Sequence, residues 1–409
     1  MADPDTRQEA VDLLQLLYNR HSLSLHLLLS EEDDATENLT INDMSMKEGL
    51  LNELETILLP YLTARIAALS SSLNLNNFAN KDPDLNLTLV LINTSHLDII
   101  LSEIMYCIEK VTLGSPLPTE SDDHYLNRCK RFRFSLLQTR ATILVRENVS
   151  LLFQKSSELI QACTTSRDDP ANSEHQARIC DIKEATLMIV NNSCKLTSSL
   201  TNLLQKTDVA LVQEEWLATA QSINSVLELL AHINNPSIES NLERDPTHIV
   251  DNGKNRKHIV EVGRSFIPFV KLIRLLLYKI STTSENKLPF ISNTMNTDKL
   301  DRLSRNPKVI IEALTLLMQG LVTLYQTNQP IRDQDQICAD FDTITETFHS
   351  TSLDICRYLV PLRDPSADLL WENIFGDYFV DLTILWHKAL LNFRTIIGGS
   401  RPENEEPVE

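Results

Sequence analysis

A glutamate and a histidine three positions apart, Glu346 and His349, form the one E-x-x-H pair in the sequence. On a helix this spacing places both side chains on the same face, where they can bind one metal ion. Di-iron bundles use two such pairs together with two further glutamates, so this chain supplies only part of that ligand set. A helical metalloenzyme using Glu346 and His349 is therefore an alternative, and no cofactor is predicted.

The common catalytic motifs are missing from the sequence. It contains no HExxH, GxSxG, GxGxxG or GxxxxGK[ST] motif, and its ten histidines are scattered. We interpret His387, beside Trp386, as a packing histidine. The seven cysteines, an odd number without a CxxC pair, predict no disulfide framework, and most of them are expected to be core thiols in a reducing compartment. A non-enzymatic protein is the prediction.

Two segments, residues 127–134 and 253–279, concentrate basic side chains in a chain whose net charge is −19. In the first, the cations point in several directions on a helix, which favours a solvated helix start. A nuclear-localisation or anion-binding signal is the alternative. In the second, cations near a helix N-terminus are unexpected, which suggests an acidic-partner or phosphate site. The candidate interaction residues are Arg128, Lys130, Arg131, Arg133, Lys254, Arg256, Lys257, Lys271 and Arg274.

Residues 264–281, RSFIPFVKLIRLLLYKIS, combine basic and apolar side chains at helical spacing. The apolar set covers an arc of about 120° at 100° per residue, with Lys271 and Arg274 on the other side. Several charges within this stretch disfavour a membrane-spanning helix. We predict a core helix with Ile273 and Leu276 fully buried. A helix lying on an anionic membrane or an acidic partner is the alternative.

Glycine and leucine contents predict the fold class. The chain of 409 residues has only 8 glycines, and it has 66 leucines. Tight β-turns and bulges need glycine, whereas leucine loses little side-chain freedom in a helix. Together with three- and four-residue apolar periodicity throughout, these counts predict an all-α protein with more than 65% helix.

The predicted helices are long and joined by short connections, which favours antiparallel neighbours. We therefore predict two tandem up-and-down helical bundles, with residues 1–168 in the first and 173–397 in the second. The seam is expected within 165–255, and residues 398–409 are expected to form a disordered acidic tail. The predicted helices start at Asp3-Pro4 and then cover about 43–78, 85–113, 122–163, 173–204, 210–233, 256–282, 307–327, 334–359 and 366–397.

A family resemblance covers roughly residues 255–397. The order HIVEVGRSFIPFVKLIRLLLYKIS, a helix pair, ICRYLVPL and the closing W-x₂-N-x-F…ILWHKALLNF resembles a large family of helical proteins of rust fungi. More remotely, the long-helix tandem bundles are similar to cyclin-D-interacting and vinculin-like proteins. The shared motifs are packing motifs, so the resemblance implies a common fold and an intracellular interaction or adaptor role.

The sequence thus predicts a non-enzymatic scaffold or adaptor with unidentified protein partners. The acidic N-terminal start lacks a secretory signal, which predicts a cytoplasmic location with the nucleus as the alternative. The net negative charge disfavours nucleic acid as a partner of the whole surface. No transmembrane segment is predicted, and peripheral contact with an anionic membrane through 127–134 and 253–279 is an alternative function.

Overall fold

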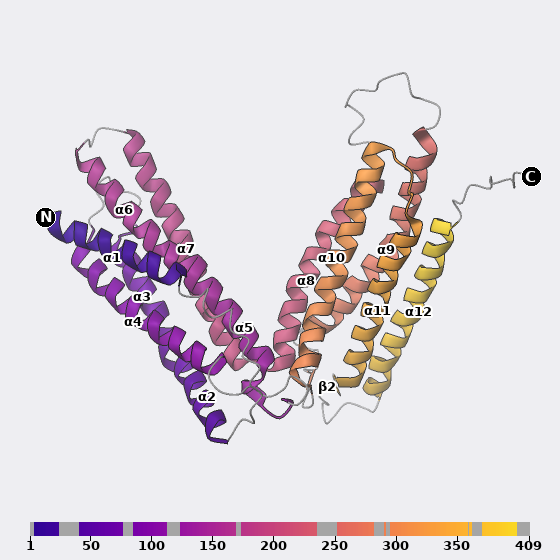
Figure 1. Cartoon of the computed structure of the whole chain (residues 1–409), viewed down its shortest axis with the longest axis horizontal. Helices are drawn as coiled ribbons and strands as arrows, with labels where there is room; N and C mark the ends of the chain where they lie inside the picture. The colour runs from indigo at the N-terminus through magenta and orange to yellow at the C-terminus, as the bar shows by residue number, and fades with distance from the viewer. Residues whose placement is uncertain are drawn as a thin grey trace, which may run out of the picture. The chain divides into compact units, whose positions relative to one another are not determined.

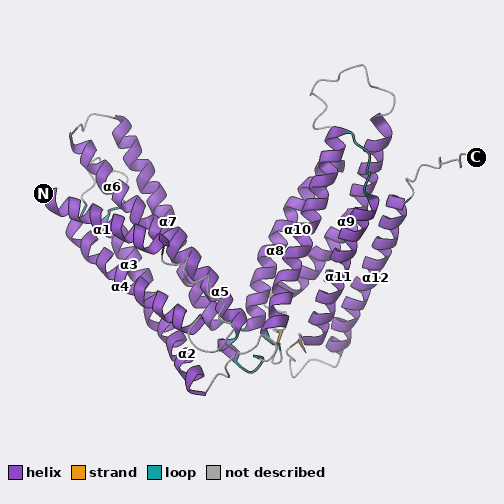
Figure 2. Cartoon of the chain, viewed as in Figure 1, coloured by secondary structure: helices purple, strands orange, loops and turns teal. Residues whose placement is uncertain are grey.

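The computed structural model describes residues 4–23, 41–76, 85–112, 123–168, 173–234, 252–281, 290–291, 295–358, 360–361 and 370–398. The described residues are almost entirely helical (Figure 2). The prediction of an all-α fold is confirmed. Of the predicted tail, Gly398 belongs to the last helix, and residues 399–409 lie outside the described residues.

The chain divides into two compact units, unit 1 from Met1 to Lys206 and unit 2 from Thr207 to Glu409. The predicted boundary at about residue 170 is therefore wrong, although the wider interval of 165–255 contains the observed one. The difference is helix α7 (Ser173–Gln205), which packs on α6 (Ser150–Asp168) and α3 (Leu59–Ser72) of unit 1. Proline and acidic residues before α7 resemble a domain linker in sequence, but the helices on either side of them both belong to unit 1.

Unit 1 is a bundle in which two of the long rods are assembled from shorter helical pieces (Figure 1). Helix α1 packs on α6 and α4, and α3 packs on α4 and α7. Its elements are α1 (Pro4–Leu23), α2 (Ile41–Glu53), the π-helical η2 (Leu54–Leu58), α3 (Leu59–Ser72), α4 (Leu87–Thr112), the 3₁₀ turn η3 (Asn127–Cys129), α5 (Arg131–Thr142), the π-helical η4 (Ile143–Val149), α6 (Ser150–Asp168) and α7.

The two π-helical segments explain how the long rods of unit 1 continue without a break. Segment η2 directly precedes Leu59-Pro60, where the missing proline N–H and the ring disfavour a regular α-helical hydrogen bond. In η4, the Asn148 side chain donates to the Ile143 carbonyl at 3.0 Å. The Ser150 hydroxyl bonds to the Val145 carbonyl at 2.7 Å. These side chains thus give hydrogen-bond partners to backbone carbonyl groups in the wider π-helical turn.

The described residues of unit 2 form an up-and-down bundle of five long helices that lie side by side (Figure 1). A two-residue antiparallel pairing, Phe290–Ile291 with Val360–Pro361, joins two of its connections. Its elements are α8 (Asp208–Asn234), α9 (Asn252–Ser281), β1 (Phe290–Ile291), α10 (Thr297–Thr327), α11 (Gln334–Tyr358), β2 (Val360–Pro361) and α12 (Leu370–Gly398).

Helix α10 begins ten residues before the predicted start at residue 307. The Asn296 side chain caps it by accepting from the Lys299 N–H at 3.1 Å. Pro307, at which the predicted helix begins, lies buried inside the observed helix. A proline-containing helix is stable here because packing of α10 on α8 and α11 compensates for the lost backbone hydrogen bond.

An aromatic cluster forms the core of unit 2. The Phe269 ring of α9 lies 4.4 Å from Phe341 of α11 and 4.9 Å from Trp386 of α12, both edge-on. Trp386 stacks on Phe348 at 3.9 Å and donates its indole N–H to the Thr345 hydroxyl at 3.3 Å. These contacts combine apolar burial with a satisfied polar group, so they fix the lateral positions of three helices.

The segment 264–281 is a core helix, as predicted. Its apolar arc is buried in the centre of unit 2, and Ile273 and Leu276 are 1% and 2% exposed. Gly263 allows α9 to approach α8 closely, because an added Cβ would lie 2.9 Å from the Ile233 side chain. The apolar arc of α9 therefore belongs to the bundle core, and its exposed face is mostly polar, with Leu275 as an exposed apolar side chain.

Candidate functional site

The exposed face of α9 is the strongest candidate site. Of the predicted residues, Lys254, Arg256, Lys257, Lys271 and Arg274 are all exposed on this helix. Two further exposed cations, Arg264 and Lys279, belong to the same face and were not among the predicted interaction residues. The seven-residue spacing of Lys257, Arg264 and Lys271 could have revealed this face, since residues seven apart lie nearly in line on a helix.

The exposed face of α9, here called the basic face of α9, carries almost only positive charges. It carries the seven cations just named and a single carboxylate, Glu261, within a chain of net charge −19. No ion pair to these seven cations occurs among the described residues. Three of them lie instead over tyrosine rings, Arg256 at 5.3 Å from Tyr325, Arg274 at 5.4 Å from Tyr278 and Lys279 at 5.1 Å from Tyr378. A tyrosine ring attracts a cation through its quadrupole but does not neutralise the positive charge as a carboxylate would.

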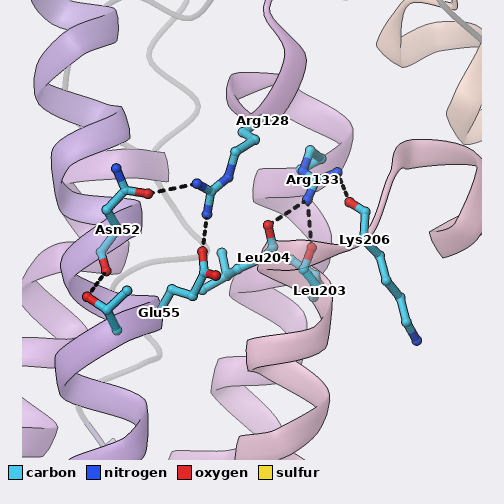
Figure 3. Close-up of polar contacts among 8 residues, drawn as sticks. Asn52, Glu55, Arg128, Arg133, Leu203, Leu204 and Lys206 are labelled. Carbon is cyan, nitrogen blue, oxygen red and sulfur yellow. Dashed lines mark hydrogen bonds and ion pairs between the residues drawn. The ribbon is translucent and has the colours of Figure 1, made fainter.

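The first basic segment does not form a comparable surface, and its prediction as a solvated helix start is wrong for two residues. Lys130 and Arg133 are buried. The Arg133 guanidinium donates to the carbonyl oxygens of Lys206 at 2.9 Å and Leu203 at 2.6 Å, at the C-terminus of α7 (Figure 3). It thereby satisfies part of the carbonyl groups that a helix end leaves without intrahelical partners, and its positive charge is favourable at a helix C-terminus.

Arg128 also acts within unit 1. Its guanidinium donates to the Asn52 side chain at 2.8 Å and pairs with Glu55 at 2.5 Å, which joins η3 to the α2–η2 rod (Figure 3). Arg131 is exposed, with its backbone N–H bonded to the Asp123 carboxylate at 3.2 Å. Of the four cations in this segment, Arg131 alone presents an exposed side chain.

A buried lysine, Lys47, was missed by sequence reasoning. Its ammonium group donates to the Val111 carbonyl at 2.9 Å, in the last turn of α4, and lies 5.3 Å from the Phe134 ring centre. Burial lowers the pKa of Lys47, while Cys129 and Asp43 oppose this change. Lys47 thus caps α4 as Arg133 caps α7. An isolated lysine in an ordinary amphipathic helix gives no signal of this role.

The possible metal ligands are only partly brought together. His349 of α11 contacts His387 of α12, with ring centres 4.9 Å apart, and Glu346 is exposed one turn earlier. Burial, and then repulsion from His387, lowers the pKa of His349. No group of three or more His, Cys, Asp or Glu side chains that could hold a metal ion exists within the described ranges. The carboxylate-rich set of a di-iron bundle is not assembled in that part of the chain.

Two described helices are long and apolar enough to cross a membrane by length and composition, α4 and α10. In their most apolar windows, 44% and 28% of the residues are buried. Core helices of soluble proteins pass the same test, so this is weak evidence for a membrane protein. The basic helix α9 is not one of the two.

The fold and the basic face together define an all-α, two-unit protein with one strongly cationic helix. The two units are similar to two different protein families. Residues 47–205 match a domain of unknown function, DUF8723, and residues 207–395 match another, DUF8721. The boundary between the matches agrees with the boundary between the units. The chain matches no curated protein sequence and no solved structure. The relationship to rust-fungal, cyclin-D-interacting or vinculin-like proteins stays a prediction.

Proposed function

We propose that this protein is an intracellular, non-enzymatic scaffold or adaptor, cytoplasmic or nuclear, that docks an acidic protein partner on the basic face of α9. One observation carries the proposal: seven exposed cations and one carboxylate share that face, without ion pairs among the described residues. Such charge segregation in an acidic protein creates a local potential that attracts and orients a negatively charged ligand.

The geometry favours a protein partner over a membrane. An interfacial helix inserts its apolar face among lipids, but the apolar face of α9 is buried in the core of unit 2. The line from Lys257 to Lys271 spans about 21 Å at 1.5 Å per residue, which suits an acidic helix or extended segment. The overall charge of −19 would oppose close approach of a large anionic surface.

The test is a triple charge reversal, Lys257→Glu, Arg264→Glu and Lys271→Glu. Its matched control is Lys110→Glu, Arg178→Glu and Lys195→Glu, three exposed cations of unit 1, so that both variants have the same net charge. Binding of a labelled oligo-glutamate peptide is measured by fluorescence anisotropy at several salt concentrations. We expect the α9 variant to lose about tenfold or more in affinity, a difference of about 1.4 kcal/mol, and the control to lose much less.

Affinity purification from source cells then compares the partners of the wild-type protein, the α9 variant and the unit 1 control variant. Partners that depend on the basic face should be lost from the α9 variant alone. Equal losses from both variants would mean that net charge, and not this face, controls binding, which contradicts the proposal. Flotation with phosphatidylserine vesicles tests the membrane alternative. Stoichiometric iron or manganese in the purified protein, lost in His349→Ala, would support the metalloenzyme alternative.

A further inference from the structure

A groove of about 750 Å³ lies in unit 2, between α10 and the first half of α11. One wall is a stripe of α10 formed by residues at three- and four-residue steps, Ala313, Leu317, Gly320 and Leu324. The opposite wall includes Ile337 of α11. Phe266 of α9 and residues of the α10–α11 connection complete the lining. The groove is thus bounded by packed helices of a single unit.

Gly320 lines this groove and leaves room in its wall. A Cβ atom added at Gly320 would meet no other atom within 4 Å, although the residue lies inside α10. Glycine in a helix interior costs about 1 kcal/mol relative to alanine. Close packing does not require the glycine here, in contrast to Gly263, so its structural effect is to leave space in the groove wall.

The apolar surface of α10 supports a role in binding. Only 28% of its most apolar window is buried, and Leu316 at the groove edge is 69% exposed. Contiguous apolar surface that remains exposed on a folded protein commonly marks an interaction site. The stripe from Ala313 to Leu324 is about 16 Å long at 1.5 Å per residue, which equals three helical turns.

Charges around the groove indicate the chemistry of its ligand. Helices α10 and α11 are antiparallel, as shown by the hydrogen bond between the Asn306 and Thr351 side chains at 3.0 Å. Asp333 and Asp340 line the groove, and Glu312 and Glu346 lie about one helical turn from the lining residues Leu316 and Thr343, on the side remote from the connection. The carboxylates that line or flank the groove are Asp333, Asp340, Glu312 and Glu346, against one lining cation, Arg332.

We propose that this groove binds an amphipathic helix of a partner protein, with apolar residues facing the stripe of α10 and cations facing the surrounding carboxylates. Helices that bind in apolar grooves present anchors at positions i, i+3, i+4 and i+7, and the stripe likewise repeats at three- and four-residue steps. The groove is distinct from the basic face of α9, and it selects a ligand of the opposite charge. Its occupation therefore does not depend on the function proposed above.

The test uses two synthetic helical peptides of roughly fourteen residues, about four turns, with the same leucine face. One carries lysines on its polar face and the other glutamates. Fluorescence anisotropy with the full chain should show the lysine peptide binding about tenfold or more tightly than the glutamate peptide. Gly320→Trp fills the groove from its wall and should remove most of this binding.

Gly49→Trp is the matched control, because Gly49 also lies in an α-helix with nothing within 4 Å of an added Cβ, but in unit 1. Circular dichroism melting of both variants verifies that they fold. Equal peptide affinity of Gly320→Trp and Gly49→Trp would overturn the proposal, because binding would then reflect only the negative charge of the protein. A second result would also overturn the proposal, in favour of a lipid surface. In that result the wild-type protein floats with neutral lipid vesicles, Gly320→Trp does not, and the lysine peptide does not inhibit the flotation.

Discussion

Replacing Arg133 tests whether a buried cation caps helix α7. The variant Arg133→Met keeps most of the side-chain stem but removes the donors to the Leu203 and Lys206 carbonyls, at 2.6 and 2.9 Å. Hydrogen bonds to charged groups contribute about 1.5–3 kcal/mol each, which gives about 3–6 kcal/mol for the two. Relief of the desolvated guanidinium charge offsets part of this loss. We expect the free energy of unfolding to fall by about 2–4 kcal/mol.

The assay is equilibrium urea unfolding followed by two signals. All three tryptophans, Trp216, Trp371 and Trp386, belong to unit 2, so their fluorescence reports on that unit. Circular dichroism reports on the helices of both units. The decrease in the free energy of unfolding of Arg133→Met should therefore be larger when it is measured by circular dichroism than when it is measured by tryptophan fluorescence.

Two companion variants separate the cap from general effects of charge. Arg131→Met removes an exposed cation of the same segment and should change stability by no more than about 0.5 kcal/mol. Arg133→Lys retains the charge but cannot reproduce the planar fork of donors, so an intermediate loss is expected. If Arg133→Met and Arg131→Met had the same stability, the assignment of Arg133 as the α7 cap would be refuted.

Three further predictions concern unit 2. Leu276→Ala should lower the free energy of unfolding by about 2–5 kcal/mol in tryptophan-monitored urea titrations, because the buried side chain leaves a cavity. Gly263→Ala should destabilise by about 1–2 kcal/mol in the same assay, since overpacking against Ile233 exceeds the gain in helix propensity, and a more stable variant would contradict this close approach. His387→Gln should raise the pKa of His349, followed by proton NMR, by removing a repulsive neighbour. Because the folded state lowers that pKa, wild-type stability should fall as pH drops below about 6.5, and the variant should lose less.

Helix positions could be predicted well because the apolar period repeats over many turns. The unit boundary could not be predicted in the same way. The apolar period of Ser173–Gln205 would be the same whether this helix packed on the helices before it or on those after it. The predicted start of α10 at residue 307 is wrong because proline is typical of the first turn of a helix. Here tertiary packing holds Pro307 inside the helix in spite of that local preference. Sequence period identifies a buried face but does not identify the helices that cover it.

The basic residues show why sites are harder to predict than elements. Arg133 and Lys257 have similar sequence surroundings in that each lies in a cluster of cations near a helix start. In the structure Arg133 is buried at the end of α7, whereas Lys257 is exposed on α9. The two clusters differ in spacing. In 127–134 the cations alternate with the buried residues Phe132 and Phe134, and Arg133, which lies between them, is buried as well. Lys257 begins a seven-residue series that keeps to the side of α9 opposite its apolar arc. Periodicity of the charges relative to the apolar residues, and not their density, is therefore the property that distinguishes a cationic binding face from cations used to complete the fold.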